Sequence, residues 1–209
     1  QGYHRPGRSQ LSPQERAAES QRLREHQEAL QSSQAHADIR RVRAALPACA
    51  QRSEVLAALA QHPVVVISGA TGCGKSTQVP QYILEDAISK GKGGDTSILV
   101  TQPRRISAIG LAQRVAQERG EEVGSSVGYS VRLDTKTSRR TRLTFCTTGI
   151  VLRRLLGQPL LEGVSHIVVD EVHERSIEID LLLLLLRDVV ARRSAPGSSL
   201  PPLHLVLMS

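Results

Sequence analysis

The feature that most constrains this chain is a glycine-rich string that directly follows a run of β-branched residues. The string fits the pattern G-x-x-x-x-G-K-[S/T], in which backbone N–H groups surround the phosphates of a nucleotide. Gly74 can adopt a positive φ without strain, Lys75 is expected to reach the β- and γ-phosphates, and Ser76 is expected to bind Mg²⁺. The predicted nucleotide-binding residues are Gly69, Ala70, Thr71, Gly72, Cys73, Gly74, Lys75, Ser76 and Thr77.

The sequence around this string supports the same interpretation. Residues 63–68 are predicted to form a strand, and residues 78–87 a helix whose N-terminus faces the phosphates. The alternative, a glycine-rich turn that arose by chance, does not account for this strand and helix. We therefore predict a nucleotide-binding phosphate loop.

A second string, Asp170-Glu171-Val-His173, follows another apolar run at residues 165–169. Ligands of open α/β sheets bind where strands end, so Asp170 is expected to hold Mg²⁺ and Glu171 to contribute to the metal site. Glu171 is also expected to orient and deprotonate the water that attacks the γ-phosphate. The alternative is that both acids only cap the next helix, because carboxylates favour helix N-termini.

The remaining pattern predicts an α/β fold. Further strands are expected at residues 97–101, 141–146 and 204–208, and helices at 52–61, 107–119, 149–156 and 177–192. Alternation of this kind predicts a mostly parallel sheet with helices on both faces.

Several strings together resemble the DExH-box, DEAH/RHA-type branch of the superfamily 2 RNA helicases. Residues 69–77 resemble motif I, Asp170 to Arg175 resemble motif II, and Thr101-Gln-Pro-Arg-Arg105 resembles motif Ia. Thr147-Thr-Gly149 resembles motif Ib, and residues 205–209 resemble the strand that enters motif III. The resemblance implies a RecA-like P-loop domain, truncated inside motif III, that uses ATP and Mg²⁺.

The resemblance also assigns roles to individual residues. Catalysis is assigned to Lys75, Glu171 and Asp170, and His173 is expected to couple hydrolysis to motif III, although a capping or packing role is its alternative. Arg114 matches the arginine that stacks on adenine. The residues expected to contact the RNA backbone are Arg104, Arg105, Arg132, Thr147 and Gly149, with a simple exposed turn as the alternative for the arginine pair.

Composition limits the partners and the compartment. Lys and Arg number 27 against 20 Asp and Glu, giving a net charge of +7, which favours a polyanionic partner. The three cysteines form no C-x-x-C pair, which favours a reducing, intracellular location, cytoplasmic or nuclear. The longest leucine run, residues 181–186, is too short to span a membrane.

The N-terminal region differs in composition from the rest. Residues 1–40 are predicted to be a disordered or polar helical extension, with disorder up to about residue 12 and a helix start at Ser12-Pro13. Residues 41–209 are predicted to be the RecA-like ATP-binding domain. The basic segment 40–43 is interpreted as a solvated face, with RNA contact as its alternative.

Three functions stay open on the sequence alone. The resemblance favours an ATP-dependent RNA helicase or ribonucleoprotein remodelling enzyme that moves 3′→5′ on single-stranded RNA. The first alternative is an ATP-gated clamp that binds RNA or ribosomes without separating strands, and the second is a P-loop ATPase acting on DNA or protein assemblies. For the helicase, the resemblance implies a second RecA-like lobe with arginine fingers and further C-terminal domains, without which residues 1–209 are expected to be nearly inactive.

Overall fold

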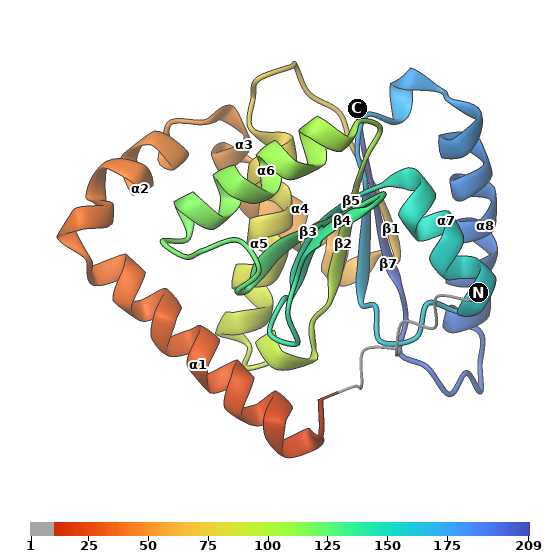
Figure 1. Ribbon diagram of the computed structural model, residues 1–209, viewed down its shortest axis with the longest axis horizontal. Helices are drawn as coiled ribbons and strands as arrows, with labels where there is room; N and C mark the ends of the chain where they lie inside the picture. Colours follow the sequence, from red (N-terminus) through yellow and green to blue (C-terminus); the bar gives the residue numbers. More distant parts are fainter. Residues whose placement is uncertain (1–10) are drawn as a thin grey trace.

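The computed structural model describes residues 11–209 as a single α/β unit built on one seven-stranded sheet (Figure 1). The strand order is β1-β7-β6-β2-β5-β3-β4, and every neighbouring pair is parallel except β3 with β4. The predicted fold class is therefore confirmed. The disorder expected for residues 1 to about 12 falls outside the described residues, apart from Leu11 and Ser12.

All five expected strands form. They are β1 (Val64–Ile67), β2 (Ile98–Gln102), β5 (Leu143–Thr147), β6 (His166–Val169) and β7 (His204–Met208). Four of them, β7, β6, β2 and β5, lie next to one another inside the sheet and are covered on both faces. A strand buried on both faces favours a continuous apolar run rather than alternation, which is the pattern that β2, β6 and β7 carry, whereas β5 has Thr144 between Leu143 and Phe145.

Two strands were not predicted. β3 (Val127–Val131) adds a parallel strand beside β5, and β4 (Asp134–Lys136) turns back antiparallel at the sheet edge. β4 is short, polar and exposed, and Gly128 and Ser130 interrupt the apolar residues of β3, so neither carries the apolar run on which the other predictions rested. Gly128 lies where any side chain would approach the carbonyl oxygen of Lys136 to 2.4 Å, so the hairpin requires glycine there.

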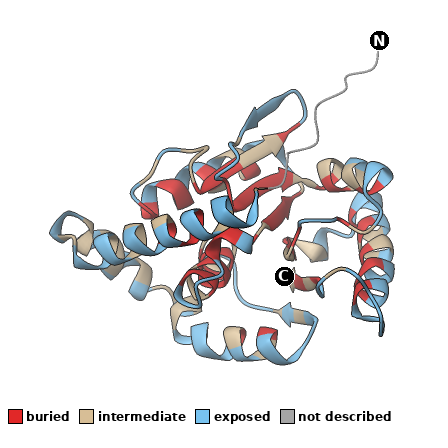
Figure 2. Ribbon diagram, turned by 90° about the horizontal axis from the view of Figure 1, so that it is seen from below, coloured by how far each residue is buried: buried red, intermediate tan, exposed pale blue. Residues whose placement is uncertain are grey.

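The core consists of two apolar clusters, one on each face of the sheet (Figure 2). Along β2, Ile98 and Val100 face the cluster beneath α4 (Arg52–Gln61), α5 (Lys75–Ser89) and α6 (Arg105–Glu118), whereas Leu99 faces the cluster beneath α7 (Thr148–Gly157) and α8 (Ile177–Ser194). Alternate side chains of one strand point to opposite faces. The sheet is therefore the middle layer of three.

The N-terminal helix is closely packed on this unit. α1 (Pro13–Ser32) starts as expected, with Ser12 and Glu15 forming a reciprocal capping box and Pro13 in the first turn. Leu23 is fully buried in the first cluster. A short 3₁₀ turn, η1 (Gln34–His36), leads to α2 (Ala37–Ala44) and the single turn α3 (Pro47–Ala50).

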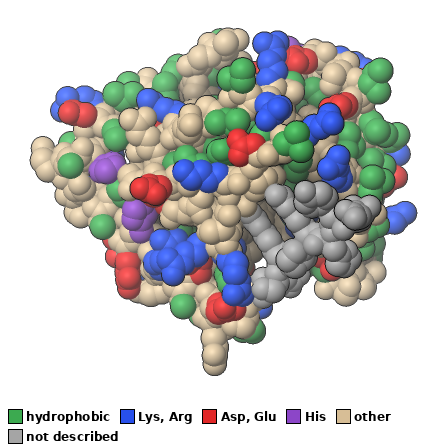
Figure 3. Space-filling view, in the orientation of Figure 1, with side chains coloured by type: hydrophobic (Ala, Val, Ile, Leu, Met, Phe, Trp, Pro, Cys, Tyr) green, Lys and Arg blue, Asp and Glu red, His purple; other side chains and the backbone are tan. Residues whose placement is uncertain are grey.

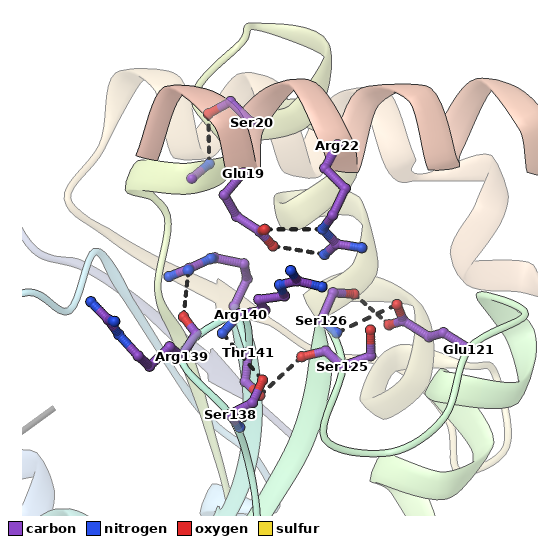
Figure 4. Close-up of polar contacts among 12 residues, drawn as sticks. Glu19, Ser20, Arg22, Glu121, Ser125, Ser126, Ser138, Arg139, Arg140 and Thr141 are labelled. Carbon is purple, nitrogen blue, oxygen red and sulfur yellow. Dashed lines mark hydrogen bonds and ion pairs between the residues drawn. The ribbon is translucent and has the colours of Figure 1, made fainter. Parts of the chain in front are cut away.

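Polar contacts fix α1 in place. The Gly94 N–H of η2 (Gly93–Asp95) donates to the Ser20 hydroxyl at 2.8 Å, and Arg16 pairs with Asp95. Figure 4 shows Glu19 and Arg22, paired at 2.7 Å, pointing from α1 toward the two segments that contain Ser126 and Thr141. Among the described residues, no helix is both long enough and apolar enough to cross a membrane.

Candidate nucleotide and nucleic-acid site

The glycine-rich string forms a loop between the end of β1 and the start of α5. Gly72 and Gly74 have φ of +81° and +96°, the left-handed region in which glycine is favoured. Gly74 is the N-cap of α5, so Lys75 and Ser76 are the first residues of that helix, three positions earlier than predicted. Unpaired N–H groups at such a helix start attract anions.

Hydrogen bonds across the loop hold its lysine. The Lys75 ammonium donates to the carbonyl oxygen of Gly69 and, at 3.2 Å, to that of Ala70. The Cys73 sulfur lies 3.8 Å from the same nitrogen. The Thr77 hydroxyl donates to the Gly74 carbonyl at 3.1 Å. Thr77 therefore stabilises the first turn of α5.

The loop is also anchored from both sides. The Gly69 N–H donates to the Ser209 carbonyl at 3.0 Å, and the Ser209 N–H donates to the Ile67 carbonyl at 3.1 Å. On the other side, the Ala48 N–H donates to the Cys73 carbonyl at 3.0 Å. Segments far apart in the sequence therefore set the shape of the loop.

The two acids of the second string take different positions after β6. Asp170 is 2% exposed, and its carboxylate accepts from the Gln102 amide at 2.6 Å and from the Glu171 N–H at 2.9 Å. Glu171 is half-buried and has a φ of +57°, which is uncommon for a side chain of this size. The Glu171 backbone is therefore locally strained, and such strain is frequent at functional sites.

His173 joins this group. Its Nε2 lies 3.2 Å from the Glu171 carboxylate, and its Nδ1 lies 3.2 Å from the Ser209 hydroxyl. The imidazole therefore links the carboxylate to the residue after β7. Glu174 pairs with Arg104 at 3.6 Å, and Arg175 pairs with Asp180 at 2.9 Å.

One cavity of about 320 Å³ brings most of these groups together. Its lining includes residues of the glycine-rich loop, two residues of the second string (Glu171 and His173) and two residues of α6. The polar and loop residues that line it include Thr71, Gly72, Lys75, Ser76, Arg114, Glu171, His173 and Ser209.

The donor chemistry fits Mg²⁺ bound together with a nucleotide. Within residues 11–209 no group of three or more His, Cys, Asp or Glu side chains could hold a metal ion by itself. Mg²⁺ is commonly held by one or two carboxylates, water and substrate phosphates instead of a full protein cage. The Ser76 hydroxyl and the carboxylates of Asp170 and Glu171 suit that mode.

The residues expected to contact RNA lie along the same edge of the sheet, where the parallel strands end. Arg104 and Arg105 follow β2, Thr147 ends β5, and Arg132 follows β3 in the hairpin. These strands are adjacent in the order β2-β5-β3, so the four side chains start from neighbouring strand ends. Figure 3 shows Lys and Arg side chains scattered over the face of the molecule that is seen in Figure 1.

Three of these positions are available for contact. Arg104 is 77% exposed apart from its pairing with Glu174, and Arg105 and Arg132 are exposed. Thr147 is the N-cap of α7, and Gly149 lies in its first turn, with nothing closer than 4.0 Å to the position of an added side chain. The first turn of α7 therefore presents backbone N–H groups at this edge.

Several site residues were not predicted from the sequence. Gln102 fixes Asp170, and Glu118 accepts from Arg114 at 2.7 Å. Arg43, interpreted as part of a solvated face, instead points inward and pairs with Glu85 at 2.8 Å. Only the spacing of four residues between Arg114 and Glu118 on one helix gave a sequence signal for any of these contacts.

Comparison with known proteins agrees with this geometry. Residues 49–189 match the family model of the DEAD/DEAH box helicases. The chain is 48% identical over 187 residues to the DExH-box ATP-dependent RNA helicase DExH1 of Arabidopsis thaliana, covering 90% of this chain and 18% of that protein. It is 49% identical over 165 residues to the ATP-dependent RNA helicase DHX30 of Homo sapiens, covering 78% of this chain and 13% of that protein.

The chain thus spans less than a fifth of the length of these relatives. The family match nevertheless covers more than half of the chain and includes both the phosphate loop and the paired carboxylates. The chain belongs to the DEAD/DEAH box helicase family.

Proposed function

We propose that this chain is the first RecA-like lobe of an ATP-dependent RNA helicase, in which hydrolysis of Mg-ATP drives 3′→5′ movement along single-stranded RNA. The observation that carries the proposal is that Lys75, Ser76 and Glu171 line the same cavity. A triphosphate in that cavity meets the helix N-terminus and the lysine at one wall and a carboxylate at the other. This is the arrangement that phosphoryl transfer to water requires.

Each residue then has a distinct role in hydrolysis. Lys75 offsets phosphate charge, and Ser76, Asp170 and Glu171 hold Mg²⁺ directly or through water, where the metal neutralises charge that develops on the phosphates. Glu171 orients the attacking water and accepts its proton. His173, held between Glu171 and Ser209, is suited to pass a change at the γ-phosphate to the strand end after β7.

The RNA partner is supported by the exposed arginines at the same edge. Arg104, Arg105 and Arg132 supply positive charge, and Thr147 and Gly149 supply short polar and backbone contacts, a set suited to phosphates rather than bases. We further propose a second RecA-like lobe elsewhere in the same protein and a reducing compartment, cytoplasmic or nuclear, which suits three free cysteines.

The test compares two variants of the full-length protein. Lys75→Ala is expected to abolish RNA-stimulated ATP hydrolysis, whereas Glu171→Gln is expected to retain ATP binding and to slow hydrolysis about 10²-fold. Lys92→Ala, an exposed lysine beyond the C-terminal end of α5, is the matched control. Near-normal turnover by Lys75→Ala would reject the proposal.

A strand-displacement assay separates movement from simple gating. The wild-type protein is expected to separate a duplex that carries a 3′ single-stranded overhang and not one with a 5′ overhang. RNA-stimulated hydrolysis without any strand separation would replace the helicase with an ATP-gated clamp.

A further inference from the structure

A buried carboxylate beside the cavity is bonded to donors from three helices. Glu118, near the end of α6, has a side chain that is only 3% exposed. It accepts from the Gln78 amide at 2.8 Å, the Gln81 amide at 2.7 Å and the Arg114 guanidinium at 2.7 Å. Arg43 of α2 lies 3.6 Å from the same carboxylate. A buried charge is tolerated only when it is paired and hydrogen-bonded to this extent.

These donors connect the carboxylate to the phosphate loop. Gln78 and Gln81 belong to α5, the helix that begins with Lys75, and the Gln78 amide also donates to the Thr77 hydroxyl at 3.0 Å. Glu118 therefore holds Arg114 in a fixed relation to the first turn of α5. Arg43 is held in turn by Glu85, which also pairs with Arg52 at 3.1 Å.

Arg114 itself is different from the other donors because it is half-exposed. Its side chain is 49% exposed and lines the cavity, although its Nε is bound to the buried carboxylate. A guanidinium fixed through one edge keeps its planar face and its remaining N–H groups available for a flat ring. Val42 and Leu46 line the same cavity, and they give it apolar surface that phosphates do not need.

We propose that Glu118 is a positioning residue for the nucleobase: it fixes the Arg114 guanidinium against the base of the bound nucleotide and ties that contact to the phosphate loop through Gln78 and Gln81. The inference rests on the proposed function, since it requires a nucleotide in this cavity. It adds a role for a residue that does not itself touch the base.

A purely structural role for Glu118 predicts something different. Loss of a structural carboxylate would disturb α5 and weaken the binding of phosphates and of the whole nucleotide alike. Loss of a positioning residue would weaken only ligands that carry a base. Mg-tripolyphosphate, which has the phosphates and no base, therefore separates the two roles.

The experiment measures dissociation constants of Mg-ATP and Mg-tripolyphosphate for the full-length protein. Glu118→Gln keeps an oxygen that can accept from Gln78 and Gln81 but removes the charge that holds Arg114. We expect its ATP affinity to fall about three- to thirtyfold, the range of a lost cation–π contact, with tripolyphosphate affinity unchanged within about twofold. Glu122→Gln, which removes an exposed charge close by on the chain, is the control.

A double-mutant cycle with Arg114→Ala completes the test. If Glu118 acts through Arg114, the double variant binds ATP no more weakly than Arg114→Ala alone, because residues that act together are non-additive. Glu118→Asp, which keeps the buried charge but withdraws it by one methylene, serves if Glu118→Gln does not fold, and it is expected to give the same selective loss.

The outcomes distinguish this inference from the proposed function. Equal loss of both ligands, additive effects in the cycle or unchanged ATP affinity would overturn the role of Glu118. Failure of the wild-type protein to bind either ligand would instead reject the nucleotide site itself.

Discussion

At the scale of single residues, the site depends on side chains that the chain brings together from distant positions. Lys75, Asp170 and Glu171 could be named from the sequence because each belongs to a short contiguous string whose spacing carries chemistry. Gln102 and Arg43 could not be named in this way, because a single polar side chain forms no periodic pattern. The partner of Gln102 lies 68 residues along the chain, and that of Arg43 lies 42 residues along it. Only the fold determines which donor meets a buried carboxylate.

The contact between Gln102 and Asp170 leads to a prediction about metal binding. Gln102→Leu removes the donor at 2.6 Å and leaves the Asp170 carboxylate held by the Glu171 N–H alone, so that it is oriented less firmly toward the metal. Groups that orient a metal ligand affect affinity about 10- to 100-fold, so the Mg²⁺ concentration for half-maximal ATPase activity should rise at least tenfold. Gln117→Leu, on the exposed side of α6, should not change it. An unchanged Mg²⁺ requirement in Gln102→Leu would contradict the orienting role.

At the scale of helices and strands, the hydrophobic pattern of the sequence predicted the elements that pack into the core. The continuous apolar runs of β2, β6 and β7 are buried on both faces, and the expected helices form with ends within a few residues of the prediction. β3 and β4 were missed because the hairpin is held by pairing to β5 and by the close approach at Gly128, not by a run of apolar residues. The division near residue 40 stays a prediction.

The docking of α1 can be tested at one glycine. A side chain on Gly94 would lie 2.0 Å from the carbonyl oxygen of Arg16, so Gly94→Ala forces α1 away from η2. We expect a loss of about 2–3 kcal/mol in the free energy of unfolding, the scale of an overpacked site, measured by chemical denaturation. Gly157→Ala, where an added side chain meets nothing within 4 Å, should change the stability by less than about 0.5 kcal/mol. Equal stability of the two variants would mean that α1 is not held against η2.

At the scale of the whole molecule, two properties depend on groups spread over the fold. The amino ends of β6 and β7 place His166 and His204 in a stacked pair with ring centres 5.0 Å apart. Burial, and then the neighbouring imidazole, lower the pKa of His166 to about 3, and burial also lowers the pKa of His204. Both rings are therefore neutral in the folded protein at pH 7.

This pair predicts how stability changes with pH. Because the pKa of His166 is lower in the folded state than its ordinary value of 6.5, the unfolded chain binds the proton first as the pH falls. The pair costs no stability above pH 6.5, and stability declines from there toward pH 3. Between pH 7 and pH 5 we expect wild type to lose about 2 kcal/mol more than His166→Gln, measured by urea denaturation. Parallel pH profiles for the two proteins would count against a neutral His166 in the folded protein.

RNA binding is the second whole-molecule property. Because Arg104, Arg105 and Arg132 are exposed at neighbouring strand ends, affinity should be electrostatic and should fall steeply with salt. Changing Arg104 and Arg105 to Ala in the full-length protein should weaken binding of two unrelated single strands equally. It should also reduce the slope of log affinity against log salt by about one for each lost phosphate contact. The matched control changes Arg187 and Arg192, which are exposed on α8. Loss confined to one RNA sequence would assign these arginines to base recognition instead.

The placement of β1 at the edge of the sheet has a consequence for the order in which the protein is made. Within residues 11–209, β7 is the only strand paired with β1, and residue 209 holds both ends of the Ile67–Gly69 turn. The phosphate loop is translated about 130 residues before the strand that anchors it leaves the ribosome. The anchored form of the phosphate loop therefore has to wait for β7, although the sequence of the loop emerges much earlier.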